Sequence, residues 1–331
     1  GRPCAPAARA RAQAVARASK TPGAAVQQTV RLVVISDTHG FEEQLEPEDI
    51  PEGDLLVHCG DYTLESSCTG KLLGLSRLDS WLADITRRRF HGRPPVVVRG
   101  NHDAAEADFK RSKAIFCGMG ETCVHAFDGA LTLFAVPWSQ ARESHLQNVR
   151  IPEGVDLLVT HVPPYGVRDL CYHGGRAGSW ALRKVVQALP RERRPKAWLF
   201  GHIHEAHGAS WLRAEAGQTT DALAVPNTTQ EAGNVLCVNA AMANDGVACK
   251  LSRPPIEIDL DLGATGVISA RLVSARFELP ASRKLGLWDW PGGRHSRGFS
   301  DGAGAQQWAA RRPTPERRTS RAREGPAEKK K

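Results

Sequence analysis

Five short polar motifs in this sequence carry the residue types that bind divalent metals. Asp37 and His39 stand two positions apart at the end of an apolar run, and residues with this spacing point to one side of an extended chain. A carboxylate oxygen beside an imidazole nitrogen makes half of a site for a divalent cation. One such pair is common by chance, so its interpretation depends on four further motifs. These are Gly60-Asp61, Gly100-Asn101-His102-Asp103, Thr160-His161 and Gly201-His202-Ile203-His204.

The motifs together supply seven oxygen and nitrogen donors and no thiolate. This set is larger than one tetrahedral zinc ion requires. Two neighbouring cations that share a carboxylate fit it better, because two-metal sites clamp the attacking and the leaving oxygen of a phosphoryl displacement. Asp61 suits the shared position, and the mixed donor set favours Mn, Fe or Zn over Ca or Mg for the two divalent metal ions. The seven predicted metal ligands are Asp37, His39, Asp61, Asn101, His161, His202 and His204.

The elements that position these residues are predicted to be buried strands. Each motif follows a short apolar run, and in open α/β folds ligands collect at the carboxyl ends of strands. Apolar residues spaced by three and four within 72–85 predict an amphipathic helix, and 180–188 predict a second one. Strands alternating with helices indicate layered α/β packing with the strands covered on both faces. The predicted strands are residues 32–36, 54–59, 95–99, 131–136, 156–160, 197–200, 235–239 and 256–260.

The composition divides the chain into a mildly acidic centre and two basic ends. Residues 1–30 carry five basic and no acidic side chains, and residues 263–331 carry fifteen basic and six acidic ones, so the net charge of +8 comes from the ends. We predict a disordered basic leader over 1–30, with organelle targeting as the alternative. A domain over 31–262 follows, and then a basic, mostly disordered tail. Within the domain, residues 211–233 are expected to form a long surface loop.

Cysteine usage and hydropathy indicate the environment of the protein. Eight cysteines show no Cys-x-x-Cys pair and no zinc-ribbon spacing, which favours free thiols in a reducing compartment and hence a cytoplasmic protein. No apolar run approaches the ~20 residues of a membrane span, so we expect no membrane partner. The acidic centre argues against a nucleic-acid-binding face on the domain itself.

The ordered motifs DTH, GD, GNHD, TH and GHIH resemble the calcineurin-like metallophosphoesterase superfamily. The segments HCGDYT, IPEGVDLLVTHVPPYG, LFGHIHEAHG and RPPIEIDL are similar to its metallophosphoesterase domain-containing (MPPED) branch. The resemblance covers about residues 31–262. It implies an α/β fold, a four-layer sandwich in which two central mixed β-sheets are flanked by helices.

The resemblance also implies a role for each motif residue. Asp37, His39 and His204 would hold the first metal. Asn101, His161 and His202 would hold the second, and Asp61 would bridge the two. A metal-bridging hydroxide would then attack phosphorus in line, with His102 as proton donor or charge stabiliser and Asp103 orienting its ring. Asn101, His102 and His39 would bind the substrate.

The predicted function is a phosphodiesterase that acts on a cyclic nucleotide or a similar small diester. His39, after the first Asp, is compatible with diesters, and the Asp61-Tyr62-Thr63 sequence lacks the Asp-Arg-Gly of protein serine/threonine phosphatases. Three alternatives stay open: a phosphomonoesterase, a nuclease that grips nucleic acid through the basic tail, and a non-catalytic metal-binding scaffold. Four rings are candidates for stacking on a base, at Tyr62, Trp138, Tyr165 and His207.

Overall fold

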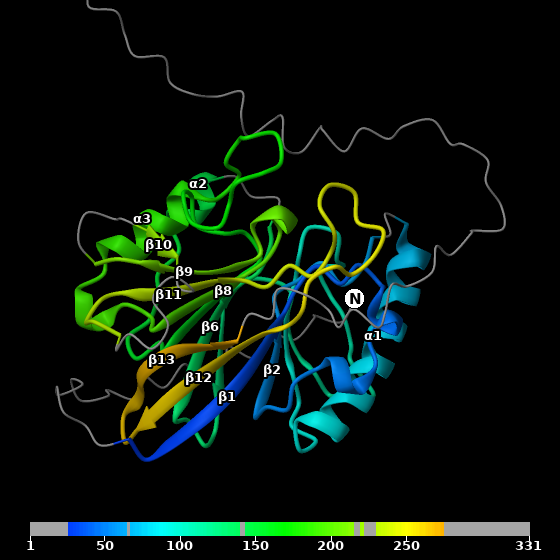
Figure 1. Cartoon of the computed structure of the whole chain (residues 1–331), viewed down its shortest axis with the longest axis horizontal. Helices are drawn as coiled ribbons and strands as arrows, with labels where there is room; N and C mark the ends of the chain where they lie inside the picture. The colour runs from blue at the N-terminus through cyan, green and yellow to red at the C-terminus, as the bar shows by residue number, and fades with distance from the viewer. Residues whose placement is uncertain (1–25, 65–66, 140–142, 215–218, 222–229, 275–331) are drawn as a thin grey trace, which may run out of the picture. The chain divides into compact units, whose positions relative to one another are not determined.

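The computed structural model describes residues 26–64, 67–139, 143–214, 219–221 and 230–274. All of them belong to one compact unit, Gly1–Trp288, and the second unit, Asp289–Lys331, lies outside the described residues. Two mixed β-sheets pack face to face in this part of the chain, with helices on the outer face of each, as Figure 1 shows. The predicted fold class, a four-layer α/β sandwich, is confirmed.

Both sheets are mixed: in the first, one edge is antiparallel and the other is parallel, and in the second both edges are antiparallel. The first sheet has the order β13 (Gly266–Ser274), β12 (Ile256–Gly263), β1 (Gln28–Ile35), β2 (Leu55–His58), β3 (Val96–Val98), β4 (Ile115–Cys117). The second has the order β10 (Thr219–Asp221), β9 (Gly208–Leu212), β11 (Val235–Asn239), β8 (Ala197–Phe200), β7 (Leu157–Thr160), β6 (Leu131–Val136), β5 (Thr122–Ala126).

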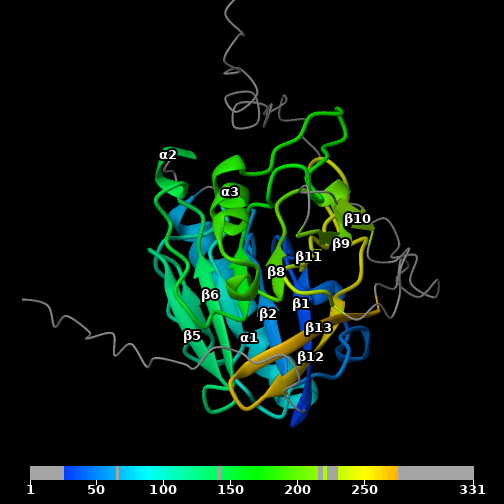
Figure 2. The ribbon, with the colours of Figure 1, turned by 90° about the vertical axis from the view of Figure 1, so that its left-hand side faces the viewer.

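The helices cover the two outer faces. Helix α1 (Cys68–Arg89) packs on the first sheet, while α2 (Glu143–Leu146) and α3 (Trp180–Ala188) lie over the second, where Figure 2 shows them toward the viewer. Ser67 and Ser179 cap α1 and α3, because each hydroxyl accepts a backbone N–H of the first turn. Single 3-10 turns complete the helical segments: η1 (Glu42–Gln44), η2 (Pro47–Asp49), η3 (Arg191–Arg193) and η4 (His204–Ala206).

Strand β1 shows why the apolar runs are continuous rather than alternating. Leu32 and Val34 point into the core between the sheets, whereas Val33 and Ile35 point into the core under α1. All four side chains are fully buried, as expected for a strand covered on both faces. The strand ends at a buried polar residue, Ser36, which bridges to Ala241 from the second sheet's side. The carboxyl ends of the two sheets therefore meet where the predicted site begins.

The structure corrects several expected boundaries. The predicted surface loop 211–233 begins inside β9 and includes β10, and the rest of it is described only at 213–214 and 230–233. Strand β13 continues the first sheet past residue 262, so the predicted tail cannot start there. Strand β1 likewise begins at Gln28, inside the predicted leader. The remaining domain bounds and the three tail tryptophans lie outside the described residues and stay predictions.

The described cysteines are all free thiols, as the spacing predicted. Burial raises the pKa of Cys117 to about 11 and of Cys237 to about 12, which makes both poor nucleophiles. Among the described residues, no helix is both long and apolar enough to cross a membrane.

Candidate metal centre

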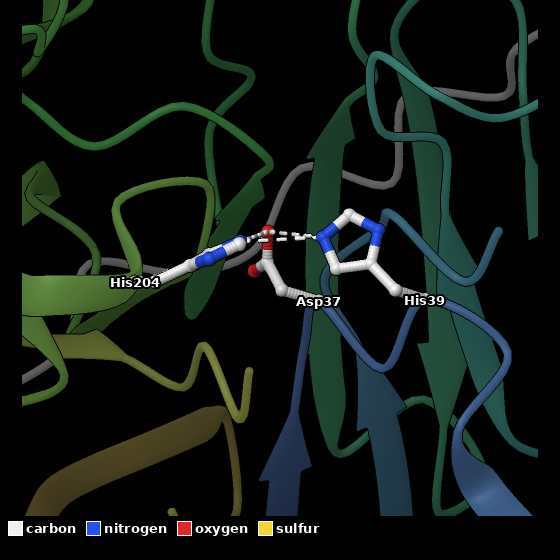
Figure 3. A group of neighbouring side chains, drawn as sticks. All are labelled: Asp37, His39 and His204. Atoms are coloured by element: carbon white, nitrogen blue, oxygen red, sulfur yellow. Dashed lines mark hydrogen bonds and ion pairs between the residues drawn. The ribbon is translucent and has the colours of Figure 1, made fainter. Parts of the chain in front are cut away.

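Asp37, His39 and His204 bring their side chains together at the carboxyl end of β1. Their nearest ligand atoms all lie within 4.8 Å of one another, and Figure 3 shows both rings turned toward the carboxylate. The Nε2 atoms of the two histidines are 3.2 Å apart, and Nε2 of His204 is 3.4 Å from Oδ1 of Asp37. The predicted first-metal trio is therefore assembled in space.

One atom of this trio indicates that a cation fits. The Asp37 side chain is fully buried, and among the described residues its Oδ1 accepts no hydrogen bond, although the His204 ring lies 3.4 Å away. An unpaired carboxylate oxygen in a buried site costs free energy unless a positive charge compensates it. Two imidazole nitrogens beside that oxygen form a mixed N/O donor set that suits Mn, Fe or Zn.

A second trio contains Asp61, His161 and His202. Their ligand atoms also lie within 4.8 Å of one another. Nε2 of His161 lies 3.3 Å from Oδ2 of Asp61 and 2.8 Å from Oδ1 of Asn101, so the amide oxygen joins the group. The structure thus brings all seven predicted ligands into two neighbouring groups, with Asp61, which the resemblance placed between the metals, in the second group.

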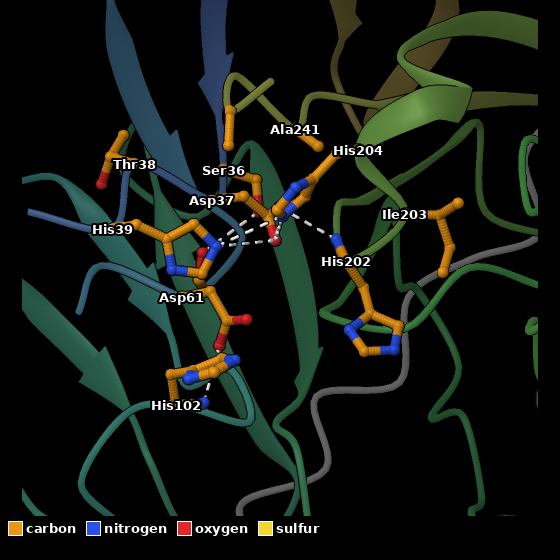
Figure 4. Close-up of polar contacts among 12 residues, drawn as sticks. Ser36, Asp37, Thr38, His39, Asp61, His102, His202, Ile203, His204 and Ala241 are labelled. Atoms are coloured by element: carbon orange, nitrogen blue, oxygen red, sulfur yellow. Dashed lines mark hydrogen bonds and ion pairs between the residues drawn. The ribbon is translucent and has the colours of Figure 1, made fainter. Parts of the chain in front are cut away.

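Backbone hydrogen bonds link the two trios. The N–H of His202 donates to Oδ2 of Asp37 at 2.9 Å, and the N–H of His39 donates to the carbonyl of Asp61 at 3.0 Å. The N–H of His102, which belongs to neither trio, donates to Oδ1 of Asp61 at 2.9 Å. Figure 4 shows Asp61 between the His39 and His102 side chains. The carboxylates of both trios are therefore held by the neighbouring motifs, which makes the centre one unit.

Three of the imidazoles are oriented in the same way. The Nδ1 atoms of His39, His161 and His204 face backbone carbonyl oxygens at 3.3, 2.9 and 3.0 Å. Donation of the Nδ1 proton to a carbonyl leaves the Nε2 lone pair free for a metal. The carbonyls belong to Thr63, Cys59 and Asn244 respectively.

The backbone at the ligands adopts left-handed conformations that side chains other than glycine rarely take. Asp37, His39, Asp61 and His202 have φ values of 54°, 51°, 57° and 71°. The expectation that Asp37 and His39 converge because the segment is extended is therefore wrong: a left-handed turn brings them together. Such conformations cost about 1–3 kcal/mol each and persist where surrounding contacts fix them, commonly at functional sites.

Two glycines are required by close packing against the carboxylates. A Cβ on Gly100 would lie 2.1 Å from Oδ1 of Asp61, and a Cβ on Gly201 would lie 2.1 Å from Oδ2 of Asp37. Neither distance is sterically allowed, so only glycine lets these two turns approach the Asp61 and Asp37 carboxylates.

Burial and neighbouring charges set the protonation state of each metal-donor side chain. Burial raises the pKa of the Asp37 and Asp61 carboxyls, but neighbouring histidines outweigh it and keep both ionised. Burial and the charge of His161 lower the pKa of His202 to about 4, so its imidazole is neutral, as ligation requires. Burial lowers the pKa of His161 as well, but Asp61 outweighs it and raises the value to about 9. His161 must lose a proton when a cation binds.

Asp103 holds the loops rather than the His102 ring. Its buried carboxylate accepts the N–H groups of Asp61 and Gly100 at 2.8 Å, of Tyr62 at 3.0 Å and of Thr63 at 3.3 Å. The predicted orienting bond to the His102 side chain is not among its hydrogen bonds in the described chain. The carboxylate instead joins the turn after β2 to the turn after β3.

The chain matches a known protein family. A family model described as calcineurin-like phosphoesterase matches residues 30–206, more than half of the chain. The chain belongs to this family. Metallophosphoesterase domain-containing protein 1 of Homo sapiens, and its counterpart of Mus musculus, are each 27% identical over 73% of this chain and 73% of theirs. A UPF0046 protein of Caenorhabditis elegans is 25% identical over 55% of this chain and 71% of its own. A solved metallophosphoesterase structure from Sphaerobacter thermophilus, 15% identical, aligns over 75% of this chain and 90% of its own with a TM-score of 0.32.

The four rings proposed for base stacking lie in different environments in this calcineurin-like phosphoesterase. Tyr62 is buried in the core under α1, so it does not face a substrate. His207 is partly exposed, and its Nε2 contacts the Pro254 carbonyl at 3.0 Å. Tyr165 stacks on Trp180. The partly exposed ring of Trp138 lies 5.7 Å from that of His202 and 6.3 Å from that of His161.

A buried carboxyl outside the ligand set is hydrogen-bonded to the residue between Asp37 and His39. Glu42 is 2% exposed and accepts a hydrogen bond from the Thr38 hydroxyl, which also contacts Nε2 of His58 at 3.0 Å. Burial raises the pKa of Glu42 from 4.5 to about 7. The folded protein therefore binds this proton more tightly than the unfolded chain does.

The raised pKa of Glu42 predicts a pH-dependent loss of stability. The folded state favours the protonated form of Glu42, so this proton contributes to the free energy of unfolding below about pH 4.5. The contribution, at most about 3 kcal/mol, is lost as the pH rises to about 7. We expect Glu42→Gln in chelator-treated protein to unfold with a smaller stability loss from pH 5 to pH 8 than wild type. Urea unfolding at both pH values measures this. Glu48→Gln, an exposed control, should keep the wild-type difference, and a wild-type difference in Glu42→Gln would contradict the prediction.

Proposed function

We propose that this chain is a dinuclear metal-dependent phosphodiesterase that acts on a small diester. One observation supports this most: two mixed His/Asp trios, joined by backbone hydrogen bonds from His202 to Asp37 and from His39 to Asp61, lie together at the carboxyl ends of both sheets. When bound, two divalent cations would supply an activated water and neutralise phosphoryl charge. Mn, Fe or Zn suits the donors.

The residues of each trio have distinct proposed tasks. Asp37, His39 and His204 would hold one cation, and His161, His202 and Asn101 the other. Asp61 would serve both, since its charge acts on His39 of the first trio while its oxygen lies against His161 of the second. The buried surroundings strengthen these charge interactions, because little water screens them.

His102 is proposed to act on the substrate rather than on the cations. Its backbone N–H donates to Oδ1 of Asp61, which fixes the residue at the edge of the centre. Its ring packs edge-on against the ring of His39, with centroids 5.3 Å apart. The side chain belongs to neither trio. It can therefore donate a proton to the leaving oxygen or stabilise phosphoryl charge. Asp103 would assist indirectly, by fixing the turns that carry Asp61 and His102.

Diester specificity is proposed from the surroundings of the centre. His39 lies next to His102, so the ring of His102 would meet the leaving group beside a ligand of the first cation. Trp138 beside His202 offers an apolar ring for the organic part of a nucleotide-like diester. A monoester, by contrast, carries an additional negative charge that would favour a further cationic side chain.

A metal-supplemented substrate comparison tests the function. Purified full-length protein is assayed by elemental analysis and then, with Mn²⁺, against bis-p-nitrophenyl phosphate and p-nitrophenyl phosphate. We expect a higher kcat/KM for the diester and complete loss of turnover with a chelator. Faster monoester hydrolysis would indicate a phosphomonoesterase. Bound metal with no hydrolysis of either compound would indicate a binding scaffold and would overturn the proposal.

A further inference from the structure

Asn239 is a fully buried residue at the carboxyl end of β11, and its side chain contacts a turn that carries two proposed metal ligands. Its Nδ2 donates to the carbonyl of Ile203 at 2.9 Å. Ile203 stands between His202 and His204, so this bond holds the centre of the turn from which both imidazoles project. Figure 4 shows the three residues of the turn.

The same carboxamide also holds the segment that follows β11. Its Oδ1 accepts the N–H of Ala241 at 3.0 Å. From there the chain passes Met242, whose N–H donates to the carbonyl of Ser36 next to Asp37, and reaches Asn244, whose carbonyl faces Nδ1 of His204. One end of the amide thus fixes a segment that orients ligands of the first trio.

A third bond extends the contact to the loop after β7. Nδ2 of Asn239 donates to the carbonyl of Arg168 at 3.1 Å. Arg168 has a left-handed φ of 48°, and its guanidinium binds the Ser210 hydroxyl and the Ala209 carbonyl, both at 2.7 Å. The loop that begins at His161 is therefore tied to β9 and β11 close to the metal centre.

Resting on the proposed function, we propose that Asn239 is a positioning residue for the metal centre. Its two N–H groups and one oxygen fix three backbone segments at once, and two of these segments place His202 and His204. The carboxamide touches neither substrate nor cation. It sets the affinity for the cations by holding the imidazoles where both can bind without rearrangement.

Only an amide satisfies this arrangement of partners. Two carbonyl oxygens, of Ile203 and Arg168, require two donors, and the N–H of Ala241 requires an acceptor. Aspartate has the same shape but would direct a carboxylate oxygen at both carbonyls. The turn would then have to move to relieve this repulsion, and the imidazoles would move with it.

The amino end of the same strand offers a matched control. Asn234, 3% exposed, directly precedes β11; its Oδ1 accepts the N–H of Ala214 at 2.8 Å and its Nδ2 donates to Glu231 at 3.0 Å. Within the described chain its side chain has no hydrogen bond to a proposed ligand or its turn. Asn234→Asp also replaces a buried amide by an acid, so it reproduces the loss of stability without the contact to the histidines.

The test is the affinity for Mn²⁺ of chelator-treated, full-length protein, measured by calorimetric titration well below the unfolding temperature. We expect Asn239→Asp to bind Mn²⁺ about 10- to 100-fold more weakly than wild type, and Asn234→Asp to bind it like wild type. Thermal unfolding should show that both variants fold with reduced stability. If Asn239→Asp does not fold, Asn239→Ala, which introduces no charge, takes its place in the comparison.

The outcomes separate this inference from the proposed function. Wild-type Mn²⁺ affinity in the folded Asn239 variant would overturn the positioning role. Equal weakening in both variants would overturn it as well, because the effect would then follow stability alone. Tight Mn²⁺ binding by wild type without diester hydrolysis would refute the phosphodiesterase and leave the role of Asn239 intact. A wild-type protein that binds no Mn²⁺ would refute both.

Discussion

Asp61→Asn is expected to abolish tight binding of the second cation and to lower diester turnover by about 10³-fold or more. A metal supplies several kcal/mol of stabilisation to the charge of the transition state, and each 1.36 kcal/mol is tenfold in rate. Asp61 is the carboxylate of the second trio, and its charge also acts on His39. Its loss therefore weakens both sides of the centre.

The substitution should leave the fold intact. The amide keeps an oxygen that accepts the N–H of His102, and the bond from the Asp61 backbone to Asp103 does not involve the side chain. Asp79→Asn is the matched control. Asp79 is a buried aspartate on α1, and its carboxylate accepts the backbone N–H groups of Arg111 and Ser112. The control substitution should lower stability and leave metal content and turnover unchanged.

A further measurement separates lost ligation from general damage. In the metal-free protein, Asp61 is the main group that raises the pKa of His161 to about 9. We expect Asp61→Asn to lower this pKa in an NMR titration, together with the loss of metal in elemental analysis. An Asp61→Asn protein that retains two cations and wild-type turnover would contradict the assignment of this carboxylate.

The central strands were predictable from sequence because burial on both faces makes them continuous apolar runs. Residues 131–136, 197–200 and 235–239 coincide with β6, β8 and β11. Strands β5 and β9 gave no such signal. In β5 only Val124 is buried, and β9 reads Gly-Ala-Ser-Trp-Leu, which looks like a loop until β11 pairs with it.

The gathering of the proposed ligands was predictable for a related reason. Each follows a buried strand, and parallel strands bring their carboxyl ends to one edge. The supporting contacts depend on tertiary structure, so spacing does not show them: the carbonyl of Asn244 oriented toward His204, and the left-handed backbone at Asp37. Asn239 carried a usable signal, since it is a polar residue at the end of a buried apolar run, as the ligands are.

His102→Ala is expected to keep both cations and to slow diester turnover by about 10²- to 10⁴-fold. The His102 side chain belongs to neither trio, and alanine retains the N–H that donates to Asp61. Metal content should therefore match wild type while kcat falls. His125→Ala, an exposed histidine on β5, is the control and should change neither quantity.

The leaving group distinguishes the two roles proposed for His102. A proton donor matters most when the departing oxygen is basic, so the loss in kcat should be small for p-nitrophenyl diesters and large for alkyl diesters. A charge stabiliser acts on the phosphoryl oxygens, so the loss should be similar for both. His39 lies next to His102 but would bind the first cation, so it cannot replace His102 as proton donor. A metal-loaded His102→Ala protein with wild-type kcat on both substrates would exclude either role.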